Sequence, residues 1–220
     1  MDQSSVSKAV AEIRGRIDRA GGNQVALVAV AKTFGSDAWG FARMAGCDAL
    51  GENYAQELVS KANEVTPANR LPVHFIGQLQ TNKVKMLADI VDVWQSVDRI
   101  SVLNEIGKRS TKGMTEAFIQ VNLTDEPDKG GCGPSEIGPL LRVAGDCGVS
   151  ITGLMTVGPT SGEPIKTRLA FRKLRTLVND FGLQHCSMGM TGDLEIAVEE
   201  GSTMVRIGSA IFGNRPSPTR

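Results

Sequence analysis

The stretch LVAVAKTFG, residues 27–35, joins an apolar run to a lysine. Residues 27–31 contain no polar side chain, and a strand built from them would bury both of its faces. Such strands are typical of parallel sheets that helices cover on both sides. An α/β fold of this kind places its chemistry at the carboxyl ends of the strands, which is where Lys32 falls. Lys32 is therefore a candidate functional residue, and the alternative is an ordinary solvated lysine.

The strand at 25–31 is the first of eight similar units that follow an amphipathic N-terminal helix. Short apolar runs predict strands at 25–31, 47–53, 73–77, 90–97, 116–122, 151–157, 185–190 and 203–208. Helical patterns follow near 36–45, from 54, and at 82–88, 99–109, 135–144, 167–180 and 193–200, with a short turn at 209–213. Eight such units predict an α/β fold, a single TIM-type (β/α)8 barrel with an extra N-terminal helix. A doubly wound open sheet is the competing fold, and the missing dinucleotide fingerprint disfavours it.

Composition places the chain among ordinary globular proteins. Its 220 residues are 41% hydrophobic and 22% charged, which suits one domain, residues 1–220, with a substantial core. Lys plus Arg and Asp plus Glu both number 24, so the formal net charge is zero. A protein that binds nucleic acid through bulk electrostatics needs an excess of positive charge. We therefore expect no nucleic-acid partner.

The cysteines and the N-terminus indicate a cytoplasmic protein. Cys47, Cys132, Cys147 and Cys186 form no CxxC pair and have no companion histidine cluster, so free thiols and no metal site are expected. The N-terminus is polar and lacks the apolar core of a signal peptide. No segment is long and apolar enough to span a membrane.

Polar residues gather at the predicted carboxyl ends of the strands. They are Lys32, Glu52, Asn53, His74, Asn122, Thr156, Ser187 and Arg206. In a barrel these side chains would form a ring around one mouth, with the lysine and the arginine placed to converge. Taken singly, residues such as Asn122 or Thr156 are more often capping or solvated groups.

The last two units predict a phosphate site. SMGMTGD, residues 187–193, puts Ser187 at the end of strand seven and Thr191 where we expect the N-cap of the next helix. RIGSAIFG, residues 206–213, puts Gly208 and Ser209 just after strand eight, where a short helix opens. Glycine lets a ligand approach the backbone, and helix N-terminal amides favour an anion. Loops after strands seven and eight form the recurrent phosphate site of this barrel, and plain turn chemistry is the alternative.

A phosphate site and a lysine at one mouth suggest a phosphorylated aldehyde that is held as a Schiff base. Arg206 lies two residues before Gly208, so its side chain should reach the same ligand. A permanently charged guanidinium beside a pyridine nitrogen would discourage protonation of the ring. The arginine therefore predicts a cofactor that is bound but weakened as an electron sink.

These residues resemble those of the pyridoxal phosphate homeostasis proteins, single-barrel relatives of the alanine racemase N-terminal domain. The matching segments, in order, are LVAVAKT, GENYAQELVSKA, HFIGQLQTNKVK, SVD, QVN, GLMT and SMGMTGDLEIAVEEGSTMVRIGSAIFG. The resemblance implies that the cofactor is pyridoxal 5′-phosphate (PLP) and that Lys32 is its Schiff-base lysine. It further implies a ring-nitrogen contact for Arg206 and a place near the cofactor for Asn53. By the same resemblance, the phosphate cradle comprises Ser187, Thr191, Gly208 and Ser209.

The chain departs from the family pattern at four positions. Ala31 and Gly130 stand where the family often has serine. Thr191 stands where serine is commoner, and Ser209 replaces a commoner threonine. The last two exchanges keep a hydroxyl, so phosphate binding should survive them.

Three further family matches have competing interpretations. His74 fits a core histidine better than a cofactor contact. Lys83 and Lys85 fit a solvated helix face better than a secondary anchoring site.

The resemblance implies a binding protein without turnover that takes part in PLP homeostasis or delivers PLP to apo PLP-dependent enzymes. The alternative is a PLP-dependent amino-acid racemase or decarboxylase, and a weaker one is a barrel for another phosphate. Racemases of this fold add a mostly β domain with a catalytic tyrosine and dimer contacts. Here the chain ends at Arg220, and its one tyrosine is Tyr54, which fits an ordinary helix face. We therefore expect no racemase activity. We also expect a monomer, because no large apolar surface helix is evident in the sequence.

Overall fold

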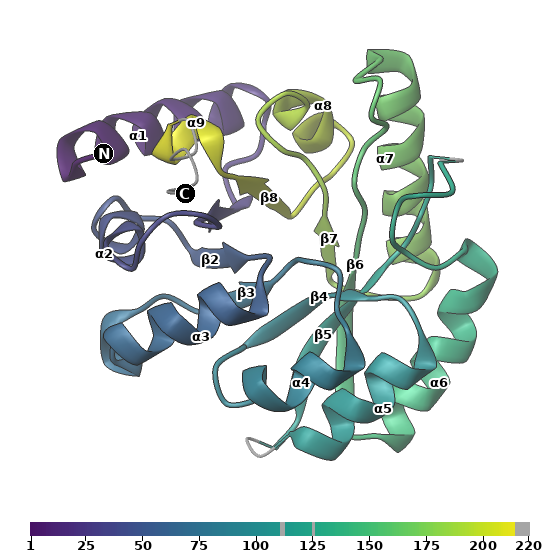
Figure 1. Cartoon of the computed structure of the whole chain (residues 1–220). Coiled ribbons are helices and arrows are strands. Elements are labelled where there is room, and N and C mark those ends of the chain that lie inside the picture. Colours follow the sequence, from purple (N-terminus) through teal and green to yellow (C-terminus); the bar gives the residue numbers. More distant parts are fainter. Residues whose placement is uncertain (111–112, 125, 214–220) are drawn as a thin grey trace.

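A computed structural model describes residues 1–110, 113–124 and 126–213, and its eight parallel strands close into a barrel in sequence order (Figure 1). The strands are β1 (Ala26–Val30), β2 (Ala49–Glu52), β3 (Val73–Phe75), β4 (Val93–Val97), β5 (Thr115–Gln120), β6 (Val149–Met155), β7 (His185–Ser187) and β8 (Met204–Ile207). Closure comes from β8, which pairs in parallel with β1 so that Arg206 lies opposite Val28. The predicted barrel is confirmed, and the open doubly wound sheet is excluded.

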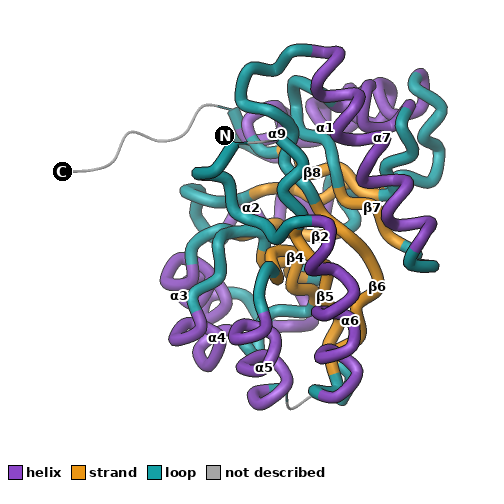
Figure 2. The backbone as a smooth tube through the Cα atoms, turned by 90° about the vertical axis from the view of Figure 1, so that its right-hand side faces the viewer, coloured by secondary structure: helices purple, strands orange, loops and turns teal. Residues whose placement is uncertain are grey.

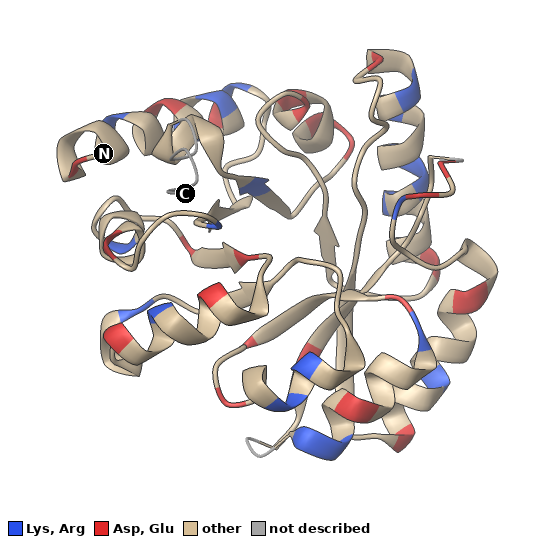
Figure 3. Cartoon of the chain, in the orientation of Figure 1, with Lys and Arg blue, Asp and Glu red and all other residues tan. Residues whose placement is uncertain are grey.

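Helices surround the strands on the outside (Figure 2). They are α1 (Gln3–Arg19), α2 (Asp37–Met44), α3 (Ala55–Glu64), α4 (Thr81–Leu87), α5 (Ile100–Arg109), α6 (Ile137–Asp146), α7 (Pro164–Asp180), α8 (Leu194–Glu199) and α9 (Ser209–Phe212). Two short 3₁₀ turns, Pro67–Asn69 and Pro134–Glu136, lie before β3 and α6. Positively and negatively charged residues are interspersed along these helices (Figure 3).

The apolar strands serve two separate cores, which explains why β1 has no polar face. Leu27 and Ala29 belong to the large cluster between the sheet and the helices. Val28 belongs to a smaller cluster with Phe118 and Met155. Successive side chains of a strand point to opposite faces, so β1, β2, β4, β5, β6 and β8 each contribute to both clusters. The inner cluster lies below the mouth of the barrel and supports the site there.

The extra helix α1 lies beside α2, α8 and α9, across the seam where β8 meets β1 (Figure 1). Its buried residues Val6, Val10, Ile13 and Ile17 repeat at spacings of four, three and four, which is one face of a helix. Asp2 caps its first turn by accepting a hydrogen bond from the Ser5 N–H. The helix therefore packs against the part of the barrel that carries both predicted phosphate loops.

One local prediction is wrong. Thr191 is not the N-cap of the following helix, because α8 begins at Leu194 and Asp193 occupies the capping position. Met190 donates its N–H to the Asp193 Oδ1 at 2.5 Å, and Asp193 donates its N–H back to the Met190 carbonyl at 3.3 Å. This closed turn delays the helix by two residues and leaves Thr191 in the loop before it.

All four cysteines are free thiols. Burial raises the pKa of Cys47, Cys132 and Cys186 to about 12, which keeps these thiols protonated. Within the described part of the chain, none of the helices has the length and apolar character that a membrane crossing requires. The same residues contain no group of three His, Cys, Asp or Glu side chains placed to hold a metal ion.

Candidate ligand site at the barrel mouth

A cavity of about 430 Å³ opens at the carboxyl ends of the strands, within the usual size of small-molecule sites. Six of the seven predicted site residues line it: Lys32, Asn53, Thr191, Arg206, Gly208 and Ser209. They come from the ends of β1, β2, β7 and β8. The fold therefore brings together residues that lie up to 177 positions apart, because β8 closes the barrel onto β1.

Apolar side chains that the sequence analysis did not assign to a site form much of the cavity wall. Val30 ends β1, Ile76 follows β3, and Val157 follows β6. Phe34 and Met190 complete this wall from the loops after β1 and β7. Their position at or just after strand ends is the feature of the sequence that indicates this role.

Lys32 lies in a tight turn directly after β1. The Phe34 N–H donates to the Ala31 carbonyl at 3.2 Å, so Lys32 and Thr33 occupy the two central positions. Thr33 has φ 70°, in the left-handed region that β-branched residues rarely adopt. Ala31 remains tied to the sheet through its N–H, which donates to the Gly51 carbonyl at 3.0 Å. The backbone that carries the Lys32 side chain is therefore fixed by hydrogen bonds on both the strand side and the turn side.

Arg206 points to the cavity from β8 and is only 4% exposed. Its Nη1 donates to the Ser187 Oγ at 2.7 Å, and its Nη2 donates to the Thr156 carbonyl at 2.8 Å. Burial lowers the pKa of Arg206 to about 10, while the nearby Asp193 carboxylate acts in the opposite direction. The guanidinium is therefore still charged at neutral pH.

Ser187 is the predicted site residue that the structure does not place in the cavity. It is fully buried behind Arg206, where its Oγ donates to the Gln95 Oε1 at 2.7 Å. Gln95 in turn donates from Nε2 to the Nδ1 of His74 at 2.6 Å. Four strands, β8, β7, β4 and β3, thus contribute to one chain of hydrogen bonds inside the barrel.

His74 ends this chain in the barrel interior and does not line the cavity. Burial lowers the pKa of His74 to about 4, so the ring is neutral at physiological pH and can accept a hydrogen bond. This placement agrees with a core histidine, and its hydrogen-bond partner is the side-chain amide of Gln95. On α4, Lys83 is half-buried and Lys85 is exposed, and neither lines the cavity.

The loops after β7 and β8 also line the cavity, through Thr191, Gly208 and Ser209. Gly208 packs closely against β1, since a Cβ there would lie 3.1 Å from the Val30 carbonyl oxygen, a tight approach to a backbone atom. Ser209 begins α9, and the N–H groups of a first helical turn have no intrahelical acceptors. Arg16 fixes the other loop, since its Nη2 donates to the Thr191 carbonyl at 3.0 Å. The same guanidinium binds both carboxylate oxygens of Glu195, at 2.7 and 2.8 Å.

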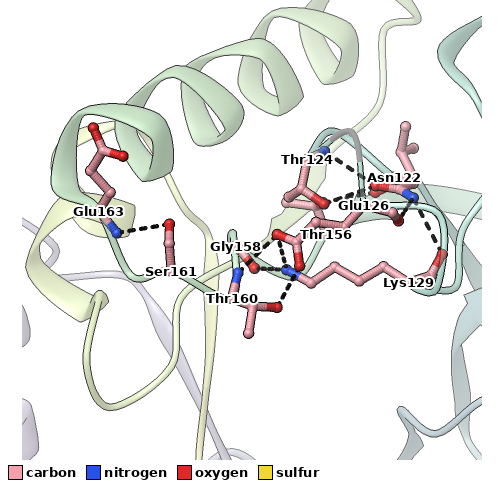
Figure 4. A network of polar contacts seen from close by, with 10 residues as sticks. Asn122, Thr124, Glu126, Lys129, Thr156, Gly158, Thr160, Ser161 and Glu163 are labelled. Carbon is pink, nitrogen blue, oxygen red and sulfur yellow. Dashed lines mark hydrogen bonds and ion pairs between the residues drawn. The ribbon is translucent and has the colours of Figure 1, made fainter.

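The loop after β5, which contains residues 128–134, is tied to the loop after β6 (Figure 4). Lys129 donates from Nζ to the Gly158 carbonyl and to the Glu126 Oε1. Glu126 also accepts from the N–H and the hydroxyl of Thr160, and these bonds lower its pKa to about 2. Asn122 donates to the Glu126 carbonyl at 3.0 Å, so this strand-end residue holds a loop.

Asn53 presents the one buried side-chain polar atom without a hydrogen-bond partner among the described residues of the cavity lining. Its Oδ1 is buried and accepts no hydrogen bond from any described residue. A buried oxygen of this kind costs free energy unless it meets a donor. A ligand with a hydrogen-bond donor beside this oxygen would supply the missing partner.

Comparison with known proteins points to one family. The sequence matches the family described as alanine racemase, N-terminal domain, over residues 2–216. It is 36% identical to the pyridoxal phosphate homeostasis protein of Pseudomonas aeruginosa over 220 residues, which cover 96% of this chain and 94% of the relative. It is 40% identical to the protein of the same name from Aquifex aeolicus over 179 residues, or 77% of this chain and 78% of the relative.

The structure also resembles PipY of Synechococcus elongatus, solved with PLP bound, with a TM-score of 0.83 and 28% identity. The match covers 94% of this chain and 100% of PipY. Sequence and fold thus agree over almost the whole length, and the chain belongs to the pyridoxal phosphate homeostasis protein family, which shares its barrel with the N-terminal domain of alanine racemase.

Proposed function

We propose that this protein binds PLP at the barrel mouth, holds it as a Schiff base on Lys32 and takes part in intracellular PLP homeostasis. The observation that carries the proposal is the meeting of Lys32 and the buried Arg206 in one cavity. The names of the relatives and the PLP bound to PipY support the same ligand. Apo PLP-dependent enzymes are the recipients that we propose for the cofactor.

The residues of the cavity fit this ligand. The hydroxyls of Thr191 and Ser209 and the backbone beside Gly208 suit a phosphate dianion. The unsatisfied Asn53 Oδ1 suits the ring hydroxyl, which can donate a hydrogen bond. Ser187 does not line the cavity, so we assign it to the positioning of Arg206 through its Oγ.

When bound, PLP supplies an aldehyde carbon and an electron-withdrawing ring. Lys32 is the residue that would hold this carbon, through a C=N bond whose formation would release the aldehyde oxygen as water. Arg206 is the cation that we assign to the ring nitrogen. With a pKa near 10 it keeps its own proton at neutral pH and has no lone pair to accept another. It therefore opposes protonation of the ring nitrogen.

We propose that the protein has no useful turnover, against the alternative of a racemase or decarboxylase. Racemisation needs bases on both faces of the substrate carbon, and Lys32 supplies one. Tyr54 is 48% exposed at the start of α3 and is not among the described residues that line the cavity. With the second base missing from the described lining, and with Arg206 opposing ring protonation, the geometry favours binding over catalysis.

The test is the visible spectrum of the protein after it has been mixed with PLP. The wild type should show imine absorbance, and Lys32→Ala should lose it while keeping some non-covalent binding through the phosphate cradle. Lys85→Ala, which removes an exposed lysine outside the cavity, is the matched control and should behave as the wild type. Unchanged imine absorbance in Lys32→Ala would refute the assignment of Lys32.

We also propose that residues 1–220 form one domain and that the protein is a monomer. The closed barrel has no free sheet edge through which two chains could pair. Residues 214–220 lie outside the described part of the chain. Light scattering after size exclusion should give the 23.4 kDa mass of one chain, and twice that mass would refute the monomer.

A further inference from the structure

We infer that Glu57 and Lys61 of α3 are positioning residues that hold the turn from which Lys32 reaches the cavity; this inference rests on the proposed function. The Lys61 Nζ donates to the carbonyl of Ala31, directly before Lys32, at 2.7 Å. The Glu57 Oε2 accepts from the N–H of Thr33, directly after Lys32, at 2.9 Å. The two charged groups thus hold the backbone on both sides of the lysine.

Glu57 and Lys61 reach the turn together because they are four residues apart in one helix. Side chains at this spacing lie one above the other on the same face. Their charged atoms, Oε2 and Nζ, are 4.0 Å apart, so each also steadies the other. The helix therefore presents an acceptor and a donor at the separation that the turn requires.

The turn needs such a restraint because of Thr33. A β-branched residue at φ 70° is strained, and a relaxed turn would move Thr33 out of this region. Its own side chain offers no compensation, since Oγ1 is buried and makes no hydrogen bond to any described residue. The hydrogen bond from the Thr33 N–H to Glu57 acts on the strained residue itself.

Lys61 is itself held firmly in place. It is 5% exposed, and its Nζ also donates to the Glu52 Oε1 at 2.7 Å. Glu52 is fully buried and accepts a further hydrogen bond from the Trp39 Nε1 at 2.9 Å. Because α2, β2 and α3 all contribute, the restraint on the Ala31 carbonyl comes from the packed part of the molecule.

The consequence concerns the rate at which Lys32 reacts. An amine that is already oriented toward the cavity loses less freedom when it attacks the aldehyde. The phosphate cradle lies on other elements, after β7 and β8. Loss of the restraint should therefore slow formation of the C=N bond and leave non-covalent binding of PLP unchanged.

The experiment measures imine formation after PLP is mixed with Glu57→Ala, by absorbance in a stopped-flow instrument. We expect it to be roughly ten- to a hundredfold slower than in the wild type. Glu57→Gln keeps a side-chain oxygen for the Thr33 N–H and should recover most of the rate. Glu64→Ala is the matched control, because this exposed glutamate of α3 bonds Ser36 and does not touch the turn.

Two further variants separate positioning from general damage. In a Lys32→Ala background, the addition of Glu57→Ala should not change PLP affinity by calorimetry. Thr33→Gly should restore the rate of Glu57→Ala, because glycine adopts φ 70° without strain. A wild-type rate in Glu57→Ala, a weakened affinity in the Lys32→Ala background, or no recovery with Thr33→Gly would each overturn the inference. Failure of the proposed function would appear instead in the wild type, as the absence of any imine.

Discussion

Thr191 and Ser209 are the two side-chain hydroxyls that we assign to the phosphate. Each hydrogen bond to a dianion is charge-assisted and is worth on the order of 1.5–3 kcal/mol. Replacing either residue by alanine should weaken PLP binding by roughly ten- to a hundredfold without changing the shape of the spectrum. Titration of each variant with PLP measures this, and Ser60→Ala, at an exposed position of α3, is the control. Wild-type affinity in the double variant would place the phosphate elsewhere.

His74 makes a prediction about acid stability. Its pKa is about 4 in the folded protein and 6.5 in the unfolded chain, so the unfolded chain binds the proton first. The stability that neutral His74 provides is complete above pH 6.5 and is lost as the pH falls toward 4. The difference between the two pKa values corresponds to a loss of about 3 kcal/mol in the free energy of unfolding.

Urea unfolding at pH 7 and pH 4.5 tests this. The wild type should lose more free energy of unfolding between these pH values than His74→Asn, which has no proton to gain. An equal loss in both proteins would show that His74 does not titrate as described.

Lys61 predicts a large effect on stability. Replacing Lys61 by methionine leaves the fully buried Glu52 without its cation, and such a change costs about 3–5 kcal/mol. Lys85→Met removes an exposed lysine of α4 and should change little. Urea denaturation compares the two variants, and a loss below about 1 kcal/mol in Lys61→Met would contradict the role of the buried pair.

Some residue pairs could not be foreseen from the sequence. The chain from Arg206 to His74 depends on which side chains of four strands point inward at the same level. That level depends on register, which shifts between Trp94 and Val97 where β4 meets β5.

The burial of Lys61, in contrast, could have been predicted, because Lys61 continues the buried face of Ala55 and Leu58 in α3. A lysine in an apolar stripe is a candidate for a buried ion pair.

At the scale of elements, helix α1 supports the phosphate loop. Arg16 connects it to the Thr191 carbonyl and to Glu195 of α8. Both side chains are partly exposed, so Arg16→Ala should cost only about 1 kcal/mol of stability. The loop should nevertheless loosen, because its carbonyl loses its donor.

Hydrogen exchange tests this expectation. Amides of residues 188–195 should exchange faster in Arg16→Ala than in Lys8→Ala, which alters an exposed position of the same helix. Equal exchange in the two variants would mean that α1 does not steady the loop.

The order of the elements was predictable because it rests on local signals. Every strand of the barrel overlaps an apolar run that was predicted as a strand, although β5 and β6 begin one and two residues earlier than predicted. The prediction that Thr191 is the N-cap was wrong, because Asp193 closes a turn with Met190. The local sequence gives no signal for this turn. Boundaries depend on such competing hydrogen bonds, whereas the number of units depends on periodicity.

At the scale of the whole molecule, barrel closure creates the site. Lys32 follows the first strand and Arg206 belongs to the last, and they meet because β1 pairs with β8. The apolar strands predicted this closure, and the strand ends and the loops after them predicted the polar side chains of the cavity lining. The cavity wall and the groups behind Arg206 required the three-dimensional arrangement.

The most direct test of the central claim is to locate the covalent link. The protein is mixed with PLP, reduced with borohydride, digested and analysed by mass spectrometry. The reduction fixes the imine, so the phosphopyridoxyl group should be found on Lys32 in the wild type and in the Lys85→Ala control. A label on a lysine outside the cavity, with Lys32 unmodified, would contradict the account.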